Sequence, residues 1–157
     1  MTSDIMDSVG QTVAVAATIA SLVFVGLQVR QNTLATRAAS HNAVSDSLNE
    51  INRMFAESAD LTRLWLAGMA DRGALTAEER WRFDATARAY FHVCETMYIQ
   101  AGLGVGDESI WRAEEDGLKQ LLAAPGIREW WTENPYGFCA AFRGYVATLA
   151  PPKETAS

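Results

Sequence analysis

Residue types that carry chemistry are scarce in this chain of 157 residues, which contains two cysteines and two histidines. Two cysteines are too few for a disulfide scaffold, and a histidine-based triad could use only one histidine or the other. The sequence has no glycine-rich phosphate loop followed by Lys-Ser/Thr and no Gly-x-Ser-x-Gly motif. We therefore expect no catalytic residue, no metal ligand and no cofactor, and we predict that the protein is not an enzyme.

Positive charge is also in short supply, with 13 Lys and Arg against 19 Asp and Glu and a net charge of −6. This balance argues against a protein that binds nucleic acid through phosphate contacts. The chain has 4 prolines, which leaves room for long helices, and its 49% of hydrophobic residues is normal for a globular protein. The length fits one domain of ordinary size.

No segment alternates apolar and polar residues as a strand would, and no internal repeat is visible. We therefore predict an all-α fold. An N-terminal transmembrane helix, residues 8–29, runs into a cytoplasmic helical bundle of about five further helices. The second segment, residues 30–58, is a helical stalk that docks on the body. The body itself covers residues 59–150, and residues 151–157 form a frayed tail.

The transmembrane prediction depends on a run of 22 residues, Ser8 to Val29, that carries no charge. As a helix this run is about 33 Å long, against roughly 30 Å of hydrocarbon in a bilayer. Two alternatives remain. A signal peptide usually begins with basic residues, whereas this chain begins with Asp4 and Asp7. A buried core helix of a soluble bundle is the other alternative, because the run is rich in alanine.

Basic residues near the apolar run predict its orientation. None precedes it, and Arg30 and Arg37 follow it. Basic residues favour the cytoplasmic side, so we expect the N-terminus outside and the body in the cytoplasm, at the inner membrane. One helix face gathers the small residues Gly10, Ala14, Ala17 and Ser21, which would let another transmembrane helix approach closely.

The stalk and the body are predicted from periodicity and from helix end signals. A heptad of Leu34, His41, Leu48 and Phe55, with Val44 and Ile51 in a second row, marks the face of the stalk that docks. We expect Asp60 to cap a helix from Leu61 to Asp71 that ends at Gly73. The capping box of Thr76 and Glu79 should open a helix from Ala77 to Ala101. Further helices are expected at Asp107–Ala124, Ile127–Thr132 and Tyr136–Leu149, separated by Pro125-Gly126 and Asn134-Pro135.

Few residues of the body are candidates for a site. His92 and Glu95 share a helix face, and we expect them to pair at the surface while Cys94 faces the core; a metal or a catalytic acid or base at His92 or Glu95 is the alternative. His41 is either a pH-responsive contact or a half-buried spacer. Adjacent Trp130 and Trp131 cannot both face the same core, so one is a possible partner contact or lies at the membrane interface; ordinary amphipathic packing is the alternative.

The segment Gln28-Val-Arg-Gln-Asn-Thr33, preceded by an apolar helix and followed by Ala38-Ala39, resembles a signature of a large family of small bacterial proteins of unknown function. The resemblance continues at Leu75–Arg80, at Phe91–Tyr98 and at Trp130-Trp131. It implies a membrane-anchored helical protein and no particular activity. The matching polar residues form a collar where the helix leaves the lipid: Gln28, Arg30, Gln31 and Asn32.

We therefore expect a single-pass membrane-anchored interaction protein whose partners are the lipid bilayer and a protein. That protein is either a second copy of the chain or a larger membrane complex, of which this chain would be an accessory subunit. The alternative function is a membrane-tethered sensor that binds a small molecule in an aromatic pocket between the helices beginning at Ala77 and Tyr136.

Overall fold

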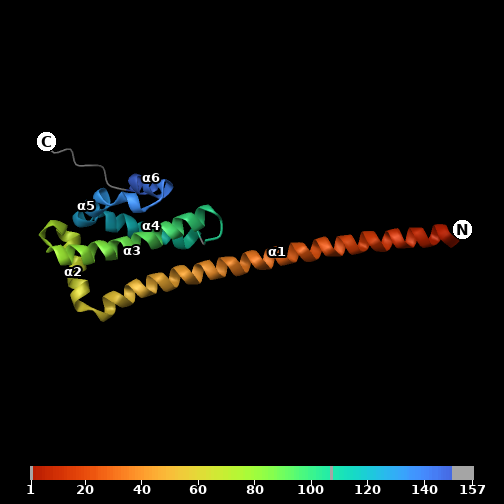
Figure 1. The fold of residues 1–157 in the computed structure, drawn as a ribbon, viewed down its shortest axis with the longest axis horizontal. Helices are drawn as coiled ribbons and strands as arrows, with labels where there is room; N and C mark the ends of the chain where they lie inside the picture. Colours follow the sequence, from red (N-terminus) through yellow and green to blue (C-terminus); the bar gives the residue numbers. More distant parts are fainter. Residues whose placement is uncertain (1, 107, 150–157) are drawn as a thin grey trace. The chain divides into compact units, whose positions relative to one another are not determined.

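The computed structural model describes residues 2–106 and 108–149, and these residues form helices without any strand, so the all-α prediction is confirmed. Six α-helices and two short 3₁₀ helices follow one another (Figure 1): α1 (Thr2–Glu57), α2 (Ala59–Ala70), η1 (Arg72–Ala74), α3 (Ala77–Gly102), α4 (Glu108–Ala123), α5 (Pro125–Glu133), η2 (Pro135–Gly137) and α6 (Ala140–Leu149). The chain divides into two compact units, Met1–Ala39 and Ser40–Ser157. The expected frayed tail at 151–157 and the expected helix start at Asp107 lie outside the described residues.

The first helix continues without a break from the apolar segment into the second unit. No proline occurs before Pro125, and no glycine lies between Gly26 and Gly68, so nothing in the sequence interrupts the backbone hydrogen bonds of this stretch. Two of its threonines bond back to the helix: Thr18 Oγ1 donates to the carbonyl of Ala14 at 2.8 Å, and Thr33 Oγ1 to that of Val29 at 2.9 Å. A threonine paired in this way adds no unsatisfied polar group to an apolar helix.

The last part of α1, from Ser40 onward, packs within the second unit. Val44 is buried, and Leu48, Ile51 and Phe55 are half-buried. Leu34 and His41 are exposed, so the expected heptad is wrong for its first two positions. In a straight helix, positions seven residues apart do not lie exactly above one another. A seven-residue repeat therefore does not keep one packing face along the whole of this segment.

The cap of α2 differs from the sequence prediction. Ser58, in an extended conformation, accepts a hydrogen bond from the backbone N–H of Leu61 at 3.1 Å. Asp60 instead lies in the first turn, where it pairs with Arg63 at 2.8 Å and Arg82 at 2.9 Å. The helix ends at Ala70 rather than at Gly73, because η1 begins directly after Asp71.

The longest helix of the second unit, α3, contacts α2, α4 and α6. It begins as predicted: Thr76 Oγ1 accepts from the N–H of Glu79, and the Glu79 carboxylate accepts from the N–H of Thr76 at 2.9 Å. Its inward face is buried among the neighbouring helices through Phe83, Ala87, Phe91, Cys94 and Met97. The turn after α3 places Gly104 at a φ of 67°, a conformation that favours glycine.

Two glycines bring α2 and α5 into direct backbone contact. A Cβ atom added to Gly126 would lie 1.8 Å from the carbonyl oxygen of Gly68, and one added to Gly68 would lie 2.3 Å from the ring of Phe83. Gly126 follows Pro125, which opens α5 where its missing N–H costs no hydrogen bond. The expected break at Pro125-Gly126 is therefore confirmed. The lack of a side chain at Gly126 also allows α2 and α5 to approach closely.

Candidate functional site

The first feature with functional meaning is the apolar surface of α1. All described residues from Ala14 to Ala39 are exposed, and the large apolar side chains from Val15 to Val29 are between 52% and 68% exposed. The segment Ala14–Glu57 contains a window with a mean hydropathy of 1.4, none of which is buried. Among the described residues, this helix is long and apolar enough to cross a membrane.

The expected small-residue stripe and polar collar both lie on this exposed surface. Gly10, Ala14, Ala17 and Ser21 are all exposed, and a Cβ atom at Gly10 would meet nothing within 4 Å. The collar residues are exposed as well, from Gln28 to Asn32. Both groups are therefore exposed and accessible to lipid or to another helix.

Trp130 and Trp131 lie differently from the expectation. Trp130 is fully buried and Trp131 half-buried, and both pack on Phe91, with ring centroids 5.1 Å and 4.9 Å away. The expectation that they cannot share one core is wrong, because the ring of Phe91 lies between α3 and α5 and meets both indoles. Buried Trp130 is not accessible to a partner.

Stacked rings also fill the space between α3 and α6, where the sequence suggested a ligand pocket. Tyr98 of α3 stacks on Tyr145 of α6 with centroids 4.8 Å apart, and its ring is 5.7 Å from that of Phe142. Phe138, between α5 and α6, is 5.1 Å from Trp131. Ring pairs at such distances add to stability beyond the area that they bury. This aromatic cluster forms part of the core.

A groove instead lies within the second unit between the end of α1 and helices α2, α3 and α4. It has a volume of about 380 Å³. Apolar side chains form most of its wall, with three uncharged polar side chains and a glycine among them; the lining residues are Ile51, Asn52, Phe55, Trp65, Met69, Thr86, Tyr90, Gly117, Gln120 and Leu121. The groove could not be predicted from the sequence, because its walls come from four helices and share no local motif.

Tyr90 connects the groove to the core. Its hydroxyl donates to the carboxylate of Glu114 on α4, and burial raises the pKa of the phenol. Burial likewise raises the pKa of the neighbouring Cys94 thiol, which is fully enclosed. A thiol with a raised pKa is a poor nucleophile, so Cys94 acts as a core residue, as expected.

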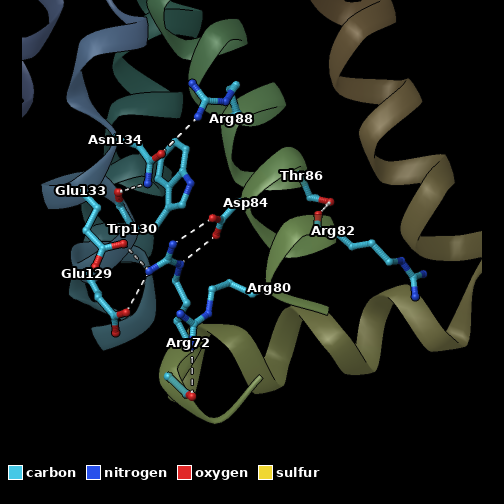
Figure 2. A network of polar contacts seen from close by, with 11 residues as sticks. Arg72, Arg80, Arg82, Asp84, Thr86, Arg88, Glu129, Trp130, Glu133 and Asn134 are labelled. Atoms are coloured by element: carbon cyan, nitrogen blue, oxygen red, sulfur yellow. Dashed lines mark hydrogen bonds and ion pairs between the residues drawn. The ribbon is translucent and has the colours of Figure 1, made fainter. Parts of the chain in front are cut away.

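A network of charged residues fixes η1 between α3 and α5 (Figure 2). The guanidinium of Arg72 makes two parallel hydrogen bonds, both 2.8 Å long, to the carboxylate of Asp84. Its Nη1 also donates to Glu129 at 2.9 Å and to Glu133 at 2.7 Å. The hydrogen bond with Asp84 is the largest influence that raises the pKa of Arg72, so the side chain stays charged. The side chain of Arg72 is 4% exposed.

His92 and Glu95 pair on α3 as expected, with His92 Nδ1 3.3 Å from Glu95 Oε2. The other carboxylate oxygen of Glu95 accepts the backbone N–H of Cys139 at 2.6 Å, just before α6 begins. One oxygen of Glu95 therefore connects α3 to the residue just before α6, and the other pairs with His92 on the same helix. Within residues 2–106 and 108–149 no group of three or more His, Cys, Asp or Glu side chains is arranged to hold a metal ion.

No family model, curated protein or solved structure matches the chain.

Proposed function

We propose that this chain is a single-pass membrane protein whose N-terminal helix anchors a cytoplasmic helical domain, and that it works by assembling with other proteins. The observation that carries this proposal is the uncovered apolar surface of α1. Burying a Val, Leu, Ile or Phe side chain is worth about 1.5–3 kcal/mol each. The row of such residues from Val15 to Val29 is exposed, and a bilayer would remove this surface from water.

The charges around α1 support one orientation. Arg30 and Arg37 follow the apolar segment and no basic residue precedes it, which favours a cytoplasmic second unit at the inner membrane. In this orientation the collar residues, Gln28, Arg30, Gln31 and Asn32, would lie at the headgroups. Self-association through the small-residue stripe and assembly with a larger membrane complex are both consistent with such an anchor.

A fractionation experiment tests the anchor, and the two cysteines report its orientation. Cys139 is exposed and Cys94 is buried, so a membrane-impermeant maleimide should react with Cys139 alone. We expect the full chain to stay with membranes after an alkaline carbonate wash. We expect the maleimide to label it in lysed spheroplasts and not in intact ones.

The Cys139→Ser variant is the control, because it should lose the label under both conditions. Recovery of the protein in the soluble fraction would contradict the anchor. Labelling in intact spheroplasts would reverse the orientation. Purification from gently solubilised membranes, with the mass of the eluted species, then separates a defined oligomer of this chain from a complex with another membrane protein.

A further inference from the structure

Aromatic side chains form part of the wall of the groove between α1, α2, α3 and α4. Phe55 and Trp65 are 5.6 Å apart between centroids, tilted at 52°, and Tyr90 faces the groove from α3. All three side chains are half-buried. A planar apolar ring is the ligand group that such walls bind most favourably.

The charge of the lining restricts the ligand further. None of the residues that line the groove carries a charged side chain. The carboxylate of Glu114, which lies beside Tyr90, accepts the hydrogen bond of the Tyr90 hydroxyl. An anionic ligand would lose its hydration here, would gain no opposite charge and would approach the Glu114 carboxylate beside Gly117, so the groove favours a neutral molecule over an anion.

Two amide side chains supply polar recognition. Asn52 on α1 and Gln120 on α4 line the groove and are exposed, and neither side chain makes a hydrogen bond within the described part of the chain. Thr86, by contrast, already donates its hydroxyl hydrogen to the carbonyl of Arg82 at 2.9 Å. The free amide N–H groups are suited to donate to a carbonyl oxygen of a ligand.

Gly117 keeps the groove open. It lies inside α4, where glycine is less favourable than any ordinary residue except proline. The packing of the chain does not demand glycine there, because an added Cβ atom would lie 3.6 Å from the Tyr90 hydroxyl oxygen, an ordinary contact. A longer side chain at this position would extend from the groove wall into the space beside Tyr90.

From these observations we propose that the groove binds a neutral small molecule with an aromatic ring system and a carbonyl group. The volume of the groove is about 380 Å³. It lies within the usual range for small-molecule sites, about 300–1,000 Å³. The inference does not depend on the membrane anchor proposed above.

Benzophenone is a suitable probe, because it has two neutral rings and a carbonyl and inserts into nearby C–H bonds when illuminated. The full chain is labelled with increasing benzophenone, digested with trypsin and analysed by mass spectrometry. Cleavage after Arg63 and Arg72 releases the peptide Leu64–Arg72, which contains the groove residues Trp65 and Met69. We expect saturable labelling of this peptide, and no saturable labelling by the carboxylate analogue benzoylbenzoate.

Two matched variants test the position of the ligand. Gly117→Leu should raise the half-saturating concentration about tenfold or more, because the leucine occupies the groove. Gly144→Leu makes the same change inside α6, where an added Cβ meets nothing within 4 Å, and should leave labelling unchanged. If Gly117→Leu fails to fold by circular dichroism, Asn52→Leu replaces it, with an expected loss of about two- to tenfold.

Several results would overturn the proposal. Labelling of Leu64–Arg72 that does not saturate shows that no site exists there. Equal labelling of the wild type and the folded groove variant shows that the ligand binds elsewhere. Equal saturable labelling by benzoylbenzoate contradicts the preference for a neutral molecule. Labelling that declines as the protein concentration rises identifies a second copy of the chain as the occupant.

Discussion

Among the described residues, Arg72 is the charged residue that is buried. Its hydrogen-bond partners lie far from it in the sequence. Its partners lie 12, 57 and 61 residues away, at Asp84, Glu129 and Glu133. A buried cation is stable only when its partners satisfy its N–H groups, so Arg72 ties η1 to both α3 and α5. This structural role of Arg72 could not be predicted from the sequence, because none of its three carboxylate partners is close to it in the chain.

Replacement of Arg72 should therefore be costly. In Arg72→Met three carboxylates lose their shared cation, but they are 23%, 42% and 57% exposed, so we expect a loss of about 1.5–3 kcal/mol in the free energy of unfolding. Arg63→Met is the matched control, because Arg63 pairs with Asp60 where both side chains are exposed, and such pairs contribute about 0–1 kcal/mol. Thermal unfolding followed by circular dichroism compares the two. Equal stability losses would show that the network contributes no more than a surface pair.

At the scale of the element, local signals predicted some of the helix ends and tertiary contacts decided the rest. The capping box at Thr76 and the break at Pro125 were correct because their hydrogen bonds and backbone restrictions act within a few residues. Ser58 and Asp60 are both good caps, and the sequence did not distinguish them. The groove and the packing of Trp130 and Trp131 on Phe91 depend on residues that only the packed fold brings together.

The capping box makes the stability of α3 depend on pH. Hydrogen bonds from Thr76 lower the pKa of Glu79 below its ordinary value of 4.5, so the folded state favours the carboxylate. This stability is present above the ordinary pKa and is lost as the pH falls through the lower, folded pKa. Thr76→Ala should cost about 1 kcal/mol at neutral pH, and less once Glu79 is protonated.

Urea unfolding at a series of pH values measures this difference. Thr96→Ala is the control for the loss of a threonine from the same helix, since Thr96 is exposed and bonds only to the carbonyl of His92. It should change stability little at any pH. A Thr76→Ala penalty that stays constant down to acidic pH would contradict the contribution of the Glu79 carboxylate.

At the scale of the whole molecule, the exposed face of small residues on α1 suggests how copies of the chain, or the chain and a partner, meet. Helices pack closely in lipid where their side chains are small. Ala17→Leu places a large side chain in the middle of the stripe Gly10, Ala14, Ala17 and Ser21. We expect it to weaken self-association in a bacterial membrane two-hybrid assay.

Ala16→Leu is the matched control for that experiment. Ala16 precedes Ala17 and therefore points about 100° away around the helix, off the stripe. The control should retain the wild-type signal. Equal signals from the wild type and Ala17→Leu would exclude the stripe as a self-association surface and would leave assembly with a different membrane protein.

Because Gly68 and Gly126 are in contact, positions in the second unit differ in how well they tolerate a substitution. Most helix surfaces can change one residue at a time, because a new side chain can extend into solvent. Gly126 cannot, since even one methyl group would overlap the carbonyl of the facing helix. Such a change alters no residue of α1. In a genetic study, a substitution at Gly126 would therefore impair the folded second unit while leaving the sequence of α1 unchanged. Its phenotype would show which functions require the second unit.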